Sequence, residues 1–596
     1  MAAIFKEKYY LLFLTAVLLA LALLPVLAVA WQVGDSWQGV PPSYIDGYYY
    51  YQRIKEVADG YPFLGNPYFW EHRLEPAPAF FFADWLAAWP MLLGGSMSFT
   101  LAFNLLLWSL FFGFTFYALL RRLGLPPGLS LAGAIWAYMV AYMMILRPVP
   151  MQQVFPFFTL FAWAFLGWWR QPTAKKQIIL LIIATVLGFY VYTYLWQIAL
   201  VWLGLAGLYL AIKKQWPALR ALGISLAAIF ILALPLIVYT VLQLNHPAYW
   251  ESLARVGMVA THLPLFNAVK ISVLMMAVMM FWWLASRFCP SFKADKFFNK
   301  SAKFFTFSGL AMIIVAFSNI VLGREMEISQ HVEKFTVIWL VSAIGCFLFF
   351  IWRERRHLSL LVPWQKIVLF FLLAVCFVSS GHYFNFYFSP RAISKSLITD
   401  IKEIQAFAAP LEWLNKNEIE PKVIWADNNE FSKYVTILTK HYVLYDGNGT
   451  IHLLPSSELE ERYLTAHYFD NLSLADIKQD IGSYGGVGNE FHQYKAHNRY
   501  VRFCRLLRLD LWGRNCGQME DAYSFKGEAY FQNLFNRYHQ EIKPFLKEKL
   551  DKFHVTYMIK DANYSSGFQP EKIAGAALVY RSPDQRFLIY KLFSQQ

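Results

Sequence analysis

The chain has 596 residues, of which 57% are hydrophobic, 18% aromatic and only 15% charged, and its mean hydropathy is +0.37. Soluble globular chains carry about a quarter charged residues. This composition therefore excludes a disordered chain, a collagen, a small disulfide scaffold and an ordinary cytosolic enzyme. A formal charge of +14 would suggest a nucleic-acid partner in a soluble protein. In so hydrophobic a chain, we expect the excess in cytoplasmic loops between membrane helices, and no nucleic-acid partner.

Apolar runs that could cross a bilayer, which takes about 20 residues, occur only before residue 385. The remainder has ordinary charge and short amphipathic elements. We therefore expect a polytopic α-helical membrane domain at 1–385, with about 11 transmembrane helices and a long outer first loop at 32–98. A mixed α/β domain is expected at 386–596. The eleven apolar runs lie near 10–31, 99–120, 128–146, 153–169, 177–194, 196–212, 221–243, 268–286, 304–322, 335–352 and 364–382.

The first apolar run allows two interpretations. Lys6 and Lys8 precede it and Ala28-Val29-Ala30 ends it, as in a cleavable signal peptide. The apolar core is long for a signal peptide, so an uncleaved helix is favoured. Either alternative exports the segment that follows.

The distribution of basic residues predicts the orientation in the membrane. With a cytoplasmic N-terminus, the inner segments hold 19 basic residues against the three acids Glu7, Asp295 and Glu354. Every inner loop then obeys the positive-inside rule. An odd number of crossings places the C-terminal domain outside, so we expect a multi-pass plasma-membrane protein with an extracytoplasmic C-terminal domain.

The C-terminal domain shows strands that alternate with helices, which predicts a partly parallel sheet. Its two cysteines, Cys504 and Cys516, are compatible with a disulfide in an oxidising compartment or with two free thiols. No Cys-x-x-Cys or His-rich zinc spacing occurs, so no structural metal is expected. The expected helices are 398–417 and 429–440, and the expected strands 423–426, 442–445, 555–559, 577–580 and 587–590.

Asp46 opens a Tyr-rich stretch in the long first loop, Gly47-Tyr48-Tyr49-Tyr50-Tyr51. The pattern predicts a helix in the membrane interface, with rings at headgroup depth and charges towards water. Asp46 would lie at the N-cap of this helix. It either only caps the helix or is a catalytic carboxylate that faces an outer cavity at the membrane surface.

Two later outer segments also collect charge. Arg147 lies in a proline-rich turn, where it would either snorkel to lipid headgroups or hold a phosphate with its guanidinium fork. Segment 323–334 is either a solvated hairpin or part of a site for an anionic lipid-linked substrate. Segment 246–264 could flank the same cavity. The candidate binding residues in segment 323–334 are Arg324, Glu325, Glu327, His331 and Lys334.

These features together resemble the GT-C superfamily of integral-membrane glycosyltransferases. The resemblance covers the membrane part as architecture, and at the residue level it is confined to the Asp46 loop and the 323–334 loop. It implies a GT-C-like fold and transfer of a sugar from a polyprenyl-phosphate-linked donor at the outer leaflet. It also implies that Asp46 is the active-site acid of the first loop. Glu325 or Glu327 would match a late outer-loop glutamate of the oligosaccharyltransferase subunit.

Two oligosaccharyltransferase signatures are missing from the chain. No acid occurs at 147–153, where an acidic motif would follow the third helix, and no Trp-Trp-Asp occurs in the C-terminal domain. A hard divalent cation needs several oxygen ligands. We therefore expect a transferase that uses no metal and no other cofactor.

The implied mechanism is an inverting single displacement. Asp46 would take the proton of an acceptor hydroxyl, while Arg147, Arg324 or Lys334 neutralises the departing phosphate. His331 is a lesser candidate for binding or proton transfer. The acceptor would be a cell-envelope glycan or a lipid-linked glycan. The alternatives are an oligosaccharyltransferase acting on protein, a lipid or glycan flippase, and a non-catalytic scaffold. The charge-poor helix interiors argue against a flippase.

Overall fold

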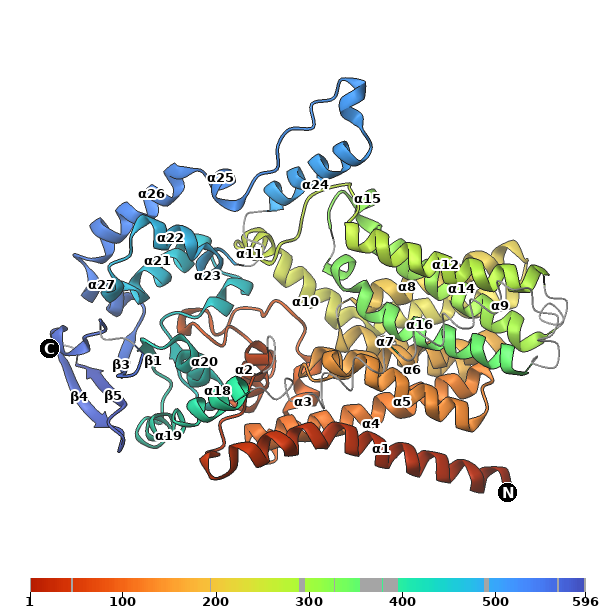
Figure 1. The fold of residues 1–596 in the computed structure, drawn as a ribbon, viewed down its shortest axis with the longest axis horizontal. Coiled ribbons are helices and arrows are strands. Elements are labelled where there is room, and N and C mark those ends of the chain that lie inside the picture. Colours follow the sequence, from red (N-terminus) through yellow and green to blue (C-terminus); the bar gives the residue numbers. More distant parts are fainter. Residues whose placement is uncertain are drawn as a thin grey trace.

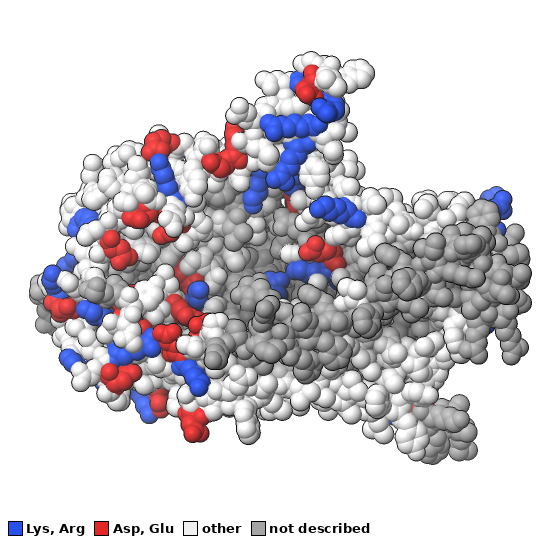
Figure 2. All heavy atoms as spheres, in the orientation of Figure 1, with Lys and Arg blue, Asp and Glu red and all other residues white. Residues whose placement is uncertain are grey.

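The computed structural model describes residues 2–43, 47–192, 194–288, 295–325, 327–353, 378, 395–486, 492–564 and 567–593. Figure 1 shows long helices gathered at one end of the molecule and an α/β part with the C-terminus at the other. Charged side chains cover the α/β part in Figure 2, whereas the described surface of the helix bundle carries few. The two predicted regions therefore differ in architecture as well as in composition.

The helix bundle is built from long apolar segments joined by short turns. Among the described residues, six helices are long and apolar enough to cross a membrane. Its helices are α1 (Ala2–Val33), α4 (Met97–Leu123), α5 (Pro127–Ile145), α6 (Pro150–Arg170), α7 (Lys175–Val191), α8 (Leu195–Ile212), α9 (Trp216–Leu232), α10 (Leu234–Leu244), α12 (Phe266–Phe288), α14 (Lys296–Ala316), α15 (Ser318–Leu322) and α16 (Glu327–Arg353).

The helical positions agree with ten of the eleven predicted runs, and the eleventh, 364–382, falls outside the described residues except for residue 378. The six helices that pass the length and apolarity test are α1, α4, α5, α8, α12 and α16, and a bent pair adds a seventh. The α7 helix has 17 residues, and α14 begins with several lysines. The total of eleven crossings stays a prediction.

The run at 221–243 is not one straight helix. It breaks at Ala233 into α9 and α10, which are bent by 52°. Pro235 explains the break, because its ring clashes with the carbonyl of residue 231 and it has no N–H to donate there.

The first helix packs along α4. Leu14, Leu18 and Ala22 are fully buried. A Cβ atom on Gly113 of α4 would lie 2.2 Å from Leu18 Cδ1, so the two helices approach closely only because Gly113 has no side chain. Whether this helix is cleaved stays a prediction.

The α/β part is built on a five-stranded sheet in the order β2-β1-β3-β5-β4. Strand β1 is parallel to β2 and β3, and the other pairs are antiparallel. The partly parallel sheet is thus confirmed. The strands are β1 (Val423–Ala426), β2 (Tyr442–Val443), β3 (Val555–Asp561), β4 (Ala576–Arg581) and β5 (Phe587–Leu592).

The predicted helix at 398–417 is two helices, α18 (Lys395–Gln405) and α19 (Ala408–Asn417). Pro410 cannot bond to the carbonyl of Ala406, and its ring crowds that carbonyl, so the chain turns between them. The other helices of this part are α20 (Asn429–Leu438), α21 (Ser456–Ala466), α22 (Leu474–Gln479), α23 (Ile481–Gly485), α24 (His492–Leu506), α25 (Ala522–Lys526), α26 (Glu528–Arg537) and α27 (Leu546–Lys552).

The two faces of the sheet are buried in different cores, because successive side chains of a strand point to opposite faces. Ile424 and Ile559 belong to one apolar core that continues into the helix bundle. Trp425 and Met558 belong to a second core inside the α/β part. The sheet and the bundle are therefore packed together.

Candidate functional site

The first loop, 34–96, lies between the bundle and the α/β part, and it contains α2 (Gly47–Ala58) and α3 (Phe82–Leu92). The predicted helix after Asp46 is confirmed, since α2 begins at the next residue. Asp46 itself lies outside the described residues, with its neighbours Tyr44 and Ile45.

The α2 helix contacts the α/β part. The Tyr48 hydroxyl donates to Glu430 Oε1 at 2.8 Å, and the Gln52 amide donates to Thr436 Oγ1 at 2.6 Å. Both partners lie on α20 of the α/β part, almost 400 residues away, so no local pattern could reveal these contacts. The position of the aromatic rings at headgroup depth stays a prediction.

A buried ion pair fixes α2 against α3. Arg53 Nη2 lies 2.7 Å from Asp84 Oδ2, its Nε donates to Oδ1 at 3.0 Å, and both side chains are 3% exposed. Arg53 Nη1 also donates to the Tyr49 hydroxyl at 3.2 Å. This bidentate ion pair compensates the buried charges of the two side chains. The sequence analysis missed Asp84, which follows Arg53 by 31 residues in an apolar segment.

Glu56 lies one turn after Arg53 and is also buried. Its Oε2 accepts a hydrogen bond from the backbone N–H of Gly65 at 3.3 Å. Burial raises the pKa of this carboxyl to about 8, in spite of that hydrogen bond and the nearby Arg53. Glu56 is therefore mostly protonated at neutral pH.

Arg147 comes from the turn between α5 and α6 and reaches α2. Its Nη2 donates to the Tyr50 hydroxyl at 2.8 Å, and its guanidinium carbon lies 5.1 Å from the Tyr50 ring centroid. Tyr50 is one helical turn from Gly47, where α2 begins. The fold thus brings the predicted phosphate-binding arginine to the first turn of the helix that follows Asp46.

Arg324 and Glu325 are held by other elements. The guanidinium carbon of Arg324 lies 4.3 Å from the ring centroid of Trp250, in α11 (Tyr249–Val256). Glu325 is fully buried, and its Oε2 accepts from Arg499 Nη2 of α24 at 2.8 Å. A substrate can reach this carboxylate only if the pair with Arg499 separates. Segment 246–264 does neighbour this loop, as predicted, because the Glu325 N–H donates to the Val259 carbonyl.

The remaining candidates lie on the first turns of α16. His331 has its ring centroid 6.2 Å from that of Tyr194, which precedes α8. His331 and Lys334 are three residues apart, so they share one face of the helix. Glu327 is the first residue of α16, and its side chain lies outside what the structure describes.

Arg255 of α11 belongs to the predicted flanking segment 246–264 and is buried. It donates to the carbonyls of Thr450, His452 and Leu454 at 2.7–2.9 Å, and to Ser456 Oγ at 2.9 Å. These acceptors all belong to one turn of the α/β part. Arg255 thus ties that part to the end of the bundle at which α11 lies.

His452 lies in the same buried junction, with its ring centroid 6.0 Å from that of Tyr49. Burial, with the nearby cations Arg53 and Arg255, lowers its pKa to about 3. His452 is therefore neutral at physiological pH.

A second ionic junction joins the first loop to α21. His72 Nε2 lies 3.0 Å from Glu458, and Arg462 bridges Glu458 and Glu71 at 2.8 and 2.6 Å. Burial lowers the pKa of His72, but hydrogen bonds to Glu458 and Glu75 outweigh it and raise the pKa to about 9. The partners lie almost 400 residues apart, so no signal in the sequence could pair them.

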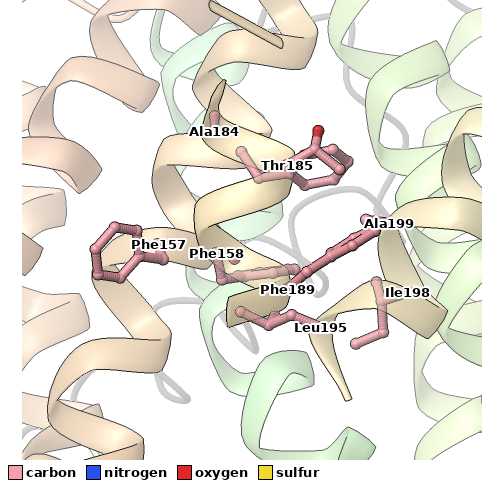
Figure 3. Close-up of a pocket in the computed structure, with 10 residues that line it drawn as sticks. Phe157, Phe158, Ala184, Thr185, Phe189, Leu195, Ile198 and Ala199 are labelled. Atoms are coloured by element: carbon pink, nitrogen blue, oxygen red, sulfur yellow. The ribbon is translucent and has the colours of Figure 1, made fainter. Parts of the chain in front are cut away.

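The pocket in Figure 3 lies elsewhere, between α6, α7 and α8. Its lining is apolar except for the Thr185 hydroxyl, which donates to the Leu181 carbonyl of its own helix. This lining offers nothing that would bind a phosphate or a sugar. Within the described ranges, no three His, Cys, Asp or Glu residues come together as metal ligands.

No protein-family model matches the chain, and no curated protein matches it at a significant level. It is similar to two crystal structures of an oligosaccharyltransferase from Archaeoglobus fulgidus. One is tethered to an acceptor peptide with an NVT sequon, with 12% identity, a TM-score of 0.41 and coverage of 99% of this chain and 74% of that chain. The other is a complex with zinc and sulfate, with 13% identity, a TM-score of 0.42 and coverage of 97% and 72%. TM-scores this low do not establish a common fold, so this likeness assigns no activity.

Proposed function

We propose that the protein is a GT-C-type membrane glycosyltransferase. It transfers a sugar from a polyprenyl-phosphate-linked donor to an extracytoplasmic acceptor, either a cell-envelope glycan or a lipid-linked glycan. The observation that carries this proposal is the contact between Arg147 and Tyr50. It joins a cation from one loop to the first turn of the helix that follows Asp46, where the reaction needs both a base and a phosphate ligand.

The proposed reaction is a single displacement with inversion at the anomeric carbon. Asp46 accepts the proton of the acceptor hydroxyl, whose oxygen attacks the sugar while the bond to the donor phosphate breaks. Arg147 binds the departing phosphate and offsets the negative charge that develops on it. Arg324 and Lys334 are further candidates for the phosphate, and His331 for the sugar or the acceptor.

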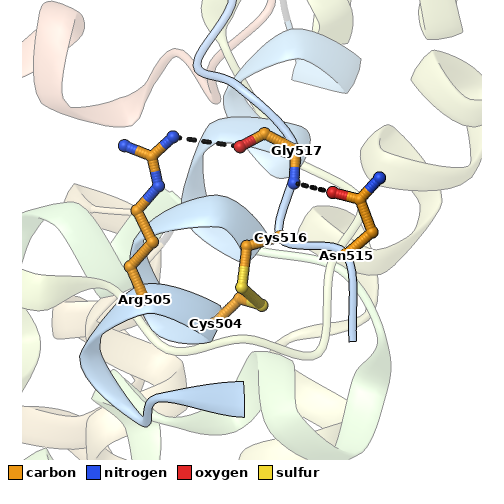
Figure 4. The surroundings of a disulfide bond; sticks show 5 residues. All are labelled: Cys504, Arg505, Asn515, Cys516 and Gly517. Atoms are coloured by element: carbon orange, nitrogen blue, oxygen red, sulfur yellow. Dashed lines mark hydrogen bonds between the residues drawn. A yellow bond between two sulfur atoms is a disulfide. The ribbon is translucent and has the colours of Figure 1, made fainter. Parts of the chain in front are cut away.

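The Cys504–Cys516 disulfide supports the proposed orientation (Figure 4). Disulfides persist in oxidising compartments and are rare in the cytosol. The α/β part would therefore be extracytoplasmic, with the basic loops at the opposite ends of the helices inside. Both features agree with a donor that is used at the outer leaflet.

Replacing the proposed base tests this function. We expect Asp46→Asn to lower the rate of transfer by about 10²–10⁴-fold, because the amide cannot accept the proton. The assay uses purified protein, polyprenyl-phosphate-linked sugars from a lipid extract and candidate acceptors. Asp35→Asn is the matched control, since Asp35 is exposed in the same loop.

Near wild-type transfer by Asp46→Asn would contradict the role of Asp46. A sequon peptide as the preferred acceptor would favour the oligosaccharyltransferase alternative. The same assay with EDTA tests metal independence, which is overturned if activity is lost and magnesium or manganese restores it.

A further inference from the structure

Residues 502–519 form what we call the stapled arm, the end of α24 and the hairpin that follows it. The disulfide between Cys504 and Cys516 closes the hairpin. Arg505 Nη2 donates to the Gly517 carbonyl at 3.0 Å, and the Gly517 N–H donates to Asn515 Oδ1 at 2.9 Å (Figure 4). Covalent and hydrogen-bonded closure gives the arm a defined shape without a core of its own.

The stapled arm exposes large apolar side chains. Leu506, Leu507, Leu511 and Trp512 are 65%, 60%, 77% and 83% exposed. Exposed apolar residues clustered in one short segment mark a surface that meets a partner or a membrane. These four side chains bury little apolar surface, so packing within this chain does not explain why they are apolar.

The same segment is strongly basic. Arg502, Arg505, Arg508 and Arg514 are exposed, and Asp510 is the one acid among residues 502–519. Figure 2 shows Lys and Arg side chains gathered over this part of the molecule. Segments that lie in the interface of a membrane with anionic lipids combine leucine and tryptophan with arginine, as this segment does.

The base of the stapled arm is fixed at the ends of two membrane-crossing helices. Phe503 stacks on Phe266, the first residue of α12, with ring centroids 4.7 Å apart and ring planes at 20°. One turn earlier on α24, Arg499 pairs with Glu325, which lies two residues before α16, and donates to the Leu263 carbonyl. Both α12 and α16 are candidate spans. The arm therefore starts beside the ends of these two candidate spans.

The neighbouring surface has the same character. The short helix α15, at the same end of the bundle, exposes Val321 and Leu322 at 84% and 62%. His262, from the segment that leads into α12, contacts the carbonyl of Ile320 in α15. In Figure 1 the arm extends past α15, away from the sheet.

We infer that the stapled arm docks on the membrane surface next to the bundle. The leucines and Trp512 enter the interfacial layer, and the arginines contact anionic headgroups. The arm thereby fixes the height and tilt of the α/β part above the bilayer. This inference does not depend on the proposed glycosyl transfer.

The experiment measures the depth of the arm in the full-length protein in lipid nanodiscs. A ketone-bearing amino acid replaces Leu511 and is coupled to a hydroxylamine spin label, which leaves the disulfide untouched. A label at Ile419, which is 82% exposed in the α/β part, is the matched control. Accessibility to oxygen and to a water-soluble nickel chelate is measured in phosphatidylcholine with about a quarter phosphatidylglycerol.

We expect the label at position 511 to be several-fold more accessible to oxygen than to the chelate, relative to position 419. Equal profiles at both positions would overturn the inference. Shielding from both reagents would indicate a protein partner or a second copy and would overturn it as well.

The arginines are tested by Arg508→Gln combined with Arg514→Gln, with Lys547→Gln and Arg581→Gln as the control pair. Each arginine near an anionic surface should favour docking by about fivefold. We expect the arm variant, and not the control, to lose the dependence on phosphatidylglycerol. An unchanged dependence would overturn the contact with anionic headgroups.

Discussion

At the level of single residues, Arg147 is a cation whose partner comes from a different loop. We expect Arg147→Gln to lower the rate of transfer by about 10²-fold, because a charged donor to the leaving phosphate is lost. Arg147→Lys should lose less, since it keeps the charge but not the planar fork. The measurement is the rate and the KM of these two variants. The same values are measured for Tyr50→Phe, which removes only the hydroxyl. A residue that only snorkels to lipid would leave all of these values unchanged.

Glu56 makes the stability of the junction depend on pH. A carboxyl whose pKa is higher in the folded state than its ordinary 4.5 favours the folded state at low pH. This contribution is lost as the pH rises from about 4.5 to about 8, and it amounts to roughly 5 kcal/mol. The melting temperature in detergent should therefore fall over this window, and Glu56→Gln should make that fall smaller.

The control for this experiment is Glu420→Gln, since the Glu420 side chain is 83% exposed. It should leave the pH profile as in the wild type. Parallel profiles for wild type and Glu56→Gln would show that Glu56 does not hold its proton in the folded protein.

At the level of the elements, the contact between α1 and α4 depends on one missing side chain. We expect Gly113→Leu to destabilise the protein and to detach α1, because even a Cβ atom would overlap Leu18. Gly345→Leu is the matched control, since a Cβ at Gly345 of α16 meets nothing within 4 Å. Thermal unfolding and protease sensitivity of the α1 segment measure the effect. Equal stability of both variants would contradict the proposed packing.

The positions of the elements were largely predictable from the sequence. Apolar runs located the helices of the bundle, and short alternating runs located the strands around Val423 and Val555. The errors are breaks inside predicted helices, at Ala233, at Phe317 and before Ala408. The breaks at Ala233 and before Ala408 follow from a proline within the run, whose effect is local and was readable. The run around Phe317 contains no proline that would have predicted its break.

At the level of the whole molecule, Arg255 holds the α/β part against the end of the bundle. We expect Arg255→Met to remove the donor of the Thr450 and Leu454 carbonyls, at about 1–3 kcal/mol for each unsatisfied group, whereas the His452 carbonyl still accepts from the Leu454 N–H. Hydrogen exchange in residues 447–456 should become faster, while exchange in β3 and β5 stays protected. Arg581→Met, at an exposed position, is the control. Unchanged protection of residues 447–456 would show that other contacts hold the junction.

The candidate site was only partly predictable. The types of residue were visible, since Asp46 and Arg147 stand out in loops between apolar helices. Their neighbours were not, because Tyr50 meets Arg147 across 97 positions and Glu325 meets Arg499 across 174. Contacts at such separations depend on how the loops and the α/β part pack, and a single sequence carries no record of them.

The sequence by itself determined that the chain divides into an apolar helical region and a polar α/β region, because a segment that spans a bilayer and a domain that is surrounded by water require different compositions. It also determined where most helices and strands lie, through their periodicity. Only the tertiary structure decided that α2 packs against α20, that Cys504 meets Cys516, and that Glu325 is buried in an ion pair. These outcomes depend on which surfaces meet in space, and local sequence patterns do not specify that.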